Sequence, residues 1–191
     1  MRTKLFFTVV LIIMAISTSY AQSVGYEKSI EINGGVGLDN NSKYGFGISM
    51  VNGYRFSDYF YLGAGVGYKS QNSLYFTSTI NYNYYESFDS RNLVQFYARA
   101  KANLSNAKIA PFLQLDLGSS IDINSNKEAG TSNGLVVEPA FGVDFKTNDP
   151  KTAIYFSIGY NIQSMSYAII SDNTVEDSSA GQLVFRVGFK F

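Results

Sequence analysis

Eight charged residues of this 191-residue chain lie at alternate places within short apolar stretches, where their side chains would share one side of a β-sheet. The set contains four acids and four bases: Glu31, Arg55, Arg99, Lys101, Asp116, Glu138, Asp144 and Arg186. An unpaired buried charge is very costly, so we predict that these groups form a structural network of ion pairs. The alternative is a thin, gated ion path in which Arg99 or Arg186 exchanges carboxylate partners.

Catalysis fits the composition poorly. The chain contains no histidine and no cysteine. Serine–histidine mechanisms and metal sites built on histidine or cysteine are therefore impossible. The sequence also lacks a phosphate loop, a dinucleotide fingerprint and a calcium loop. We expect a protein that is not an enzyme and has no cofactor or metal, although no spacing rules out a carboxylate pair or a serine–lysine site.

A second candidate site is the tyrosine-rich segment 70–91. Its aromatic residues stand among Asn, Ser and Thr: Tyr75, Phe76, Tyr82, Tyr84, Tyr85 and Phe88. Tyrosine with small polar residues is typical of adaptable binding surfaces. The alternation of Ile80, Tyr82 and Tyr84 also fits two strands that simply continue as a hairpin. The two interpretations are compatible, because a protruding hairpin offers an edge for docking.

The elements that position these residues are strands. Apolar residues alternate with polar ones or glycine in eight stretches, separated by turn-forming residues: 28–38, 43–56, 59–69, 92–104, 108–120, 134–146, 152–164 and 181–191. Short turns near 57–58, 105–107 and 147–151 alternate with long polar loops near 70–91, 121–133 and 165–179. Strands of this length can cross a bilayer at a tilt. We predict an all-β fold, an eight-stranded antiparallel up-and-down transmembrane barrel.

The glycines distinguish a membrane barrel from a soluble, lipocalin-like one. Twelve of the seventeen glycines fall on the polar face of the predicted strands, whereas Gly34 lies on the apolar face. Glycine is useful inside a narrow barrel, where there is little room for side chains. The apolar face therefore points outward to lipid. Aromatic residues at both ends of this face would form two interfacial rings.

Two features test this assignment of faces. Tyr61, Tyr97, Phe112 and Tyr155 fall on the inner face, where they either fill the lumen or indicate a local slip of register. Pro111 and Pro139 lie within strands, and each is expected to mark a bulge or a local opening.

The first 21 residues have the features of a cleaved secretory signal peptide. Two basic residues precede an apolar run of twelve, and small residues at Ser19 and Ala21 follow it. We predict that residues 22–191 form the barrel domain. Loss of Arg2 and Lys4 leaves 13 basic and 15 acidic residues, a net charge of −2. Nothing in this balance indicates a nucleic-acid partner.

The chain ends on GQLVFRVGFKF, in which Phe185, Val187, Phe189 and Phe191 occupy alternate places. The last strand of a closed barrel pairs with the first, so the chain can end inside the sheet without an exposed edge. This ending resembles the C-terminal signature of Gram-negative outer-membrane barrels, which the barrel-assembly machinery reads in those families. The whole mature chain resembles the outer membrane protein beta-barrel family, of the small OmpA/OmpX type.

The resemblance implies an outer-membrane location among lipids, with the barrel-assembly machinery as a partner of the last strand. We expect a monomer with a structural or cell-surface interaction role, and a surface protein or glycan as its partner. The alternatives are a small porin-like channel for ions or solutes, and a soluble periplasmic lipocalin-like barrel.

Overall fold

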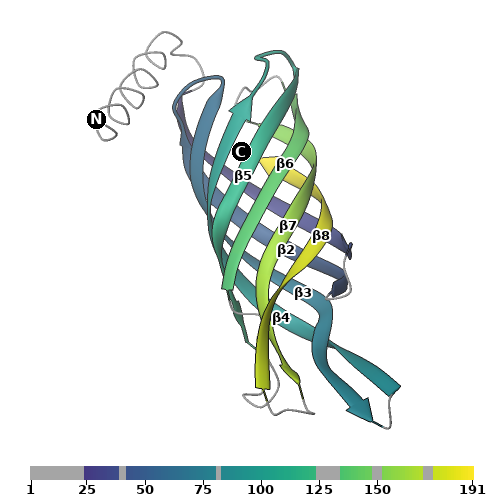
Figure 1. Cartoon of the computed structure of the whole chain (residues 1–191). Coiled ribbons are helices and arrows are strands. Elements are labelled where there is room, and N and C mark those ends of the chain that lie inside the picture. The colour runs from purple at the N-terminus through teal and green to yellow at the C-terminus, as the bar shows by residue number, and fades with distance from the viewer. Residues whose placement is uncertain (1–23, 39–41, 81–82, 124–133, 148–151, 170–173) are drawn as a thin grey trace, which may run out of the picture.

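Eight strands make up the computed structural model, which describes residues 24–38, 42–80, 83–123, 134–147, 152–169 and 174–191. They are β1 (Gly25–Gly37), β2 (Ser42–Arg55), β3 (Phe60–Ile80), β4 (Asn83–Asn103), β5 (Ile109–Asp122), β6 (Gly134–Lys146), β7 (Ala153–Ile169) and β8 (Thr174–Lys190). Each strand pairs antiparallel with its sequence neighbours, and β8 pairs back with β1 (Figure 1). The predicted closed eight-stranded barrel is confirmed. None of the described residues forms a helix that is long and apolar enough to span a membrane.

Burial alternates along the strands and places the polar side chains inside. In β5, Gln114 and Asp116 are only 4% and 3% exposed, whereas Leu113, Leu115 and Leu117 are 52%, 39% and 47% exposed. The same alternation extends through β6 and most of β1. The predicted faces are therefore correct, with an apolar wall that faces outward.

Aromatic rings fill the interior at the four positions where the alternation raised a question. Tyr61, Phe112 and Tyr155 are at most 3% exposed, and Tyr97 contacts the interior Arg99. The strand pairs show no slip of register at these residues. The four rings thus fill the lumen, and the alternative of a local slip is wrong.

Gly118 shows why the inner face needs glycine. A Cβ atom there would lie 2.0 Å from the Phe96 carbonyl oxygen and 2.6 Å from the Tyr97 Cα, so backbone would have to move. We expect Gly118→Ala to lower the free energy of unfolding by about 1–3 kcal/mol, the usual cost of overpacking. A Cβ on outward-facing Gly34 would meet nothing within 4 Å, so Gly34→Ala is the matched control. Urea titration scored by the gel shift of unheated samples measures both, and equal stability of the two variants would contradict a packed lumen.

The two prolines are accommodated without a bulge. Pro139 keeps its partner on β5, but the β6–β7 ladder omits Glu138 and Pro139 and then resumes in the same register. Pro111 lies one residue beyond the last β4–β5 pair, where its carbonyl oxygen accepts a bond from the Leu104 amide. The expectation of a local opening is met at Pro139, where the missing N–H leaves a gap. The expectation at Pro111 is wrong, because the end of a ladder tolerates a missing donor.

Two hairpins extend beyond the end of the barrel that carries the long connections. β3 and β4 pair as far as Ile80 and Asn83, and β7 and β8 pair as far as Ile169 and Thr174. Much of the predicted loops 70–91 and 165–179 is therefore strand, because cross-strand pairing continues past the apolar stretch. The hairpin interpretation of the tyrosine-rich segment is confirmed.

The two hairpins meet across the mouth of the barrel. Beyond its last pair with β2, at Ser73, β3 forms parallel pairs with β7 through Phe76–Ala168 and Thr77–Ile169. A register irregularity between Leu74 and Phe76 precedes this contact. The strands β8, β7, β3 and β4 thus form a small sheet at the mouth, which we call the mouth sheet.

Candidate functional site

The eight charged residues singled out by alternation all lie inside the barrel. Their exposed fractions range from 0% at Asp144 to 6% at Glu138 and Arg186. They come from six of the eight strands and meet because the barrel closes around them. Burial of this kind requires partners for every charge.

A central cluster surrounds Arg99. Its guanidinium binds both oxygens of Asp116 on the neighbouring strand, at 2.7 and 2.8 Å, and it also pairs with Glu31 across the lumen. Arg186 contacts Glu31 at 3.1 Å and Glu138 at 2.5 Å, and lies 3.5 Å from Asp116. Two guanidinium groups therefore share three carboxylates, and bidentate geometry makes such contacts strong.

A second cluster lies nearer the short turns. Arg55 binds Glu27 with two contacts of 2.6 and 3.1 Å, and Lys101 binds Asp144 at 2.7 Å. Lys190 lies between them, 3.4 Å from Glu27 and 4.0 Å from Asp144. Each acid in this cluster faces more than one base, so each carboxylate is compensated.

Aromatic rings link the two clusters. The Tyr155 hydroxyl donates to Glu31 in the central cluster. The Lys101 Nζ lies 3.7 Å from the Phe112 ring centre and 4.6 Å from that of Tyr155, at cation–π distance. Ion pairs and rings thus occupy the lumen between the two clusters.

Six further buried charges were missed by the sequence analysis. They are Glu27, Asp58, Lys69, Arg91, Asp122 and Lys190, and with the predicted eight they make seven acids and seven bases among the described residues. Lys69 and Lys190 stand at inward-facing positions of the predicted stretches 59–69 and 181–191, so the alternation could have found them. Glu27, Arg91 and Asp122 were missed because they lie one or two residues outside the predicted stretches 28–38, 92–104 and 108–120. The interior is therefore neutral overall.

Amides occupy the interior between the central cluster and the mouth. Gln71, Asn161, Gln163 and Gln182 are each at most 2% exposed. A cavity between this layer and the central cluster, lined in part by Lys69, has a volume of only about 20 Å³. That is room for about one water molecule. This cavity could therefore hold a water molecule but no larger solute.

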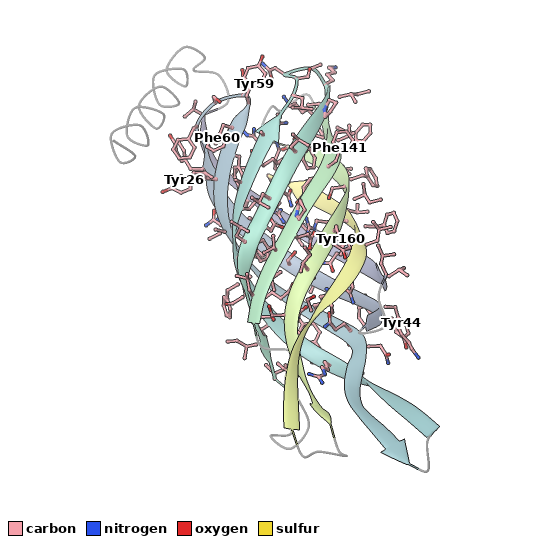
Figure 2. All side chains as sticks on the ribbon, in the orientation of Figure 1. Tyr26, Tyr44, Tyr59, Phe60, Phe141 and Tyr160 are labelled. Atoms are coloured by element: carbon pink, nitrogen blue, oxygen red, sulfur yellow. The ribbon has the colours of Figure 1, made fainter. Side chains whose placement is uncertain are left out.

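The outer wall presents the aromatic rings expected at its two ends. Near the short turns, Tyr54, Phe56, Phe145, Phe189 and Phe191 are 36–46% exposed. Near the mouth, Tyr44, Phe46, Tyr68 and Tyr160 are 39–63% exposed. Figure 2 shows Tyr26 and Phe60 towards one end of the wall and Tyr44 towards the other.

The residues of the tyrosine-rich segment belong to the mouth sheet. Tyr75 and Phe76 lie in β3, and Tyr84, Tyr85 and Phe88 lie in β4, whereas Tyr82 falls outside the described residues. The backbone positions bring the five together on one hairpin.

The last strand closes the barrel as its sequence required. β8 pairs with β7 and β1, and Phe191 exchanges two backbone hydrogen bonds of 2.9 Å with Lys28. Phe185, Val187, Phe189 and Phe191 all face outward, with 39–53% of each exposed.

Among the residues that the structure describes, no group of acidic side chains is arranged to hold a metal.

Comparisons with known proteins agree with this architecture. The family model for the outer membrane protein beta-barrel domain matches residues 8–191. No curated protein matches the chain significantly.

The chain also matches several solved structures. OprG from Pseudomonas aeruginosa is 9% identical, with a TM-score of 0.57 over 89% of this chain and 97% of its own. The N-terminal barrel domain of OprF from the same organism is 16% identical, with a TM-score of 0.49 over 88% and 99%. Neisserial surface protein A is 15% identical, with a TM-score of 0.47 over 89% and 100%. The likeness to OprG supports the fold alone. From the family match over nearly the whole chain, this protein belongs to the outer membrane protein beta-barrel family and resides in the outer membrane.

Proposed function

We propose that the protein is a closed, non-enzymatic barrel that anchors the mouth sheet at the cell surface, where it binds a protein or glycan partner. In barrels of this class the short turns face the periplasm and the longer connections face outward. The mouth sheet would then stand outside the membrane. The soluble lipocalin-like alternative does not fit a protein of the outer membrane.

The observation that carries this proposal is the contrast between the interior and the mouth. Paired charges, rings and amides occupy the lumen, whereas the two hairpins extend past the barrel and join through β3 and β7. Within the described part of the chain, no strand pairs with residues 83–89 of β4 on the side away from β3. An open strand edge can accept an extended segment of a partner through backbone hydrogen bonds.

The same proposal covers how the barrel assembles and its oligomeric state. The barrel-assembly machinery would read the outward aromatic residues of β8, as in the families that this ending resembles. The protein would act as a monomer, because its strands already pair in a closed ring.

The absence of histidine from the whole sequence supports a role other than catalysis.

The test replaces residues 75–88 with a short Gly/Ser turn. We expect the barrel to keep its heat-dependent gel shift, because the deleted residues lie beyond the β3–β2 pairs that end at Ser73. We expect binding of the detergent-solubilised protein to a glycan array, or to cross-linked envelope proteins, to disappear.

A matched variant keeps the hairpin and replaces only Tyr75, Tyr84 and Tyr85 with threonine, which also favours strands. Loss of binding in both variants would assign the contact to the rings. Loss in the shortened variant alone would assign it to the strand edge. Failure of the shortened barrel to fold would contradict the proposal, because the hairpin would then be structural. Full binding by both variants would also contradict it.

A further inference from the structure

A groove on the lipid-facing wall has no role in the proposal above. It has a volume of about 560 Å³ and crosses β6, β7, β8 and β1. That volume falls in the usual range for pockets that bind small ligands. One wall is the row Gly34, Phe185, Ile158 and Phe141, and the other is the row Ile32, Val187, Phe156 and Val143, as the strand pairs align them. Both walls are apolar.

Gly34 opens one end of the groove. It faces outward on β1, and a Cβ atom there would meet nothing within 4 Å. Elsewhere along the walls, phenylalanine side chains protrude: Phe185, Phe141 and Phe156 are 53%, 48% and 51% exposed. Figure 2 shows Phe141 pointing away from the ribbon. Three strand spacings give the groove a length of about 14 Å across the strands, around the barrel wall.

One lysine, Lys28, lies on β1 near the end of the barrel that carries the short turns. Lys28 is exposed and shares the outward column of β1 with Ile30, Ile32 and Gly34. Of the described residues that face outward on the barrel wall, Lys28 is the only charged one. Its backbone is fixed at the β1–β8 seam by two hydrogen bonds to Phe191.

The groove begins less than one leaflet depth from Lys28. Ile32 follows Lys28 by four positions on β1, about 13 Å along the strand and about 10 Å in depth for a strand tilted as in such barrels. The short-turn end faces the periplasm, so Lys28 would lie at the headgroup level of the inner leaflet. A lysine at that level attracts a lipid phosphate, and an acyl chain leading from it would reach the groove.

We propose that this wall is a binding site for one phospholipid of the periplasmic leaflet. Lys28 holds the phosphate, and one acyl chain lies along the β1–β8 seam and in the groove between the two apolar rows. The site is independent of any partner at the mouth sheet.

The experiment is native mass spectrometry of the intact barrel in a neutral detergent, titrated with dipalmitoyl phosphatidylethanolamine. The unaltered protein should retain one lipid. Gly34→Leu fills the groove and should weaken retention by about tenfold, since it displaces methylenes from the wall. Phe141→Ala removes a wall and should have a similar effect. Lys28→Gln should weaken retention by about fivefold.

Two controls leave the site intact. Ala98→Leu adds a bulky residue to an exposed position on β4, and Lys108→Gln removes an exposed lysine from a short turn. Both should retain lipid as the unaltered protein does, and the unheated gel shift confirms folding in each case. Equal retention by all variants would overturn the proposal. Preference for lipid A over phosphatidylethanolamine would overturn the choice of leaflet. Equal binding of free palmitate, insensitive to Lys28→Gln, would overturn the role of the phosphate.

Discussion

Replacing Arg99 with methionine is expected to lower the free energy of unfolding by about 3–5 kcal/mol, the usual cost of breaking a buried ion pair. Arg99 binds both oxygens of Asp116 and also pairs with Glu31, and all three residues are at most 3% exposed. Without the guanidinium, the two buried carboxylates would have to share Arg186. The barrel would then be the least stable of the variants considered.

The measurement is a urea titration of the barrel refolded into lipid vesicles. The chain has no tryptophan, so the gel shift of unheated samples is a better signal than intrinsic fluorescence. The exposed Lys43→Met serves as a control for loss of a positive charge. Adding Glu31→Gln to Arg99→Met should restore part of the loss, because one unpaired charge is removed. A loss below about 1 kcal/mol, the range of exposed ion pairs, would mean that the network is not structural.

Serine at both Phe189 and Phe191 is expected to abolish most of the folded barrel in the outer membrane while export continues. The two rings stack with centroids 5.8 Å apart and are each 46% exposed on the lipid-facing wall. The change removes two members of the aromatic ring near the short turns, together with the terminal residues that an assembly receptor would recognise. Fractionation of the cells, followed by gels with and without heating, measures the folded fraction.

The control places two phenylalanine-to-serine substitutions elsewhere in the aromatic ring near the short turns. Phe56 and Phe145 are 40% and 43% exposed, close to the values at the C-terminus. Phe56→Ser with Phe145→Ser should reduce the folded fraction far less, because it leaves β8 unchanged. Equal damage from the two pairs would indicate lost lipid contact alone. Normal levels of the C-terminal variant would rule out the assembly role.

The membrane-crossing part of the fold could be predicted from the sequence because two local patterns coincide there. Leu113, Leu115 and Leu117 alternate with Gln114 and Asp116, and this period of two assigns each residue to a face. The short turns between strands carry Asn, Asp, Ser and Pro, which end the alternation clearly. Both signals are properties of neighbouring residues, so no tertiary information was required.

The strand ends at the mouth could not be predicted in the same way. β3 and β4 pair as far as Ile80 and Asn83, well past the predicted stretches 59–69 and 92–104, and the pattern in between fitted a loop as well as a hairpin. Arg91 and Asp122 were missed for this reason. The parallel contact between Phe76 and Ala168 joins strands that are distant in sequence, and no local pattern encodes it.

The grouping of charges into two clusters also depends on closure of the barrel. Arg99 and Asp116 are cross-strand neighbours, which a correct register would reveal. Glu31 reaches Arg99 only across the lumen, from a strand 68 residues earlier. Which residues meet there follows from the stagger between strands around the whole barrel.

Single-channel recording of the intact protein in a planar bilayer tests most directly whether the barrel is closed. Paired charges and rings fill the lumen around Arg99 and Lys101, and a cavity nearer the mouth measures only about 20 Å³. We predict no stable conductance steps from preparations whose gel shift proves that the barrel is folded. Large, long-lived steps that change with Arg99→Met would contradict a closed barrel and would instead support a small porin-like channel.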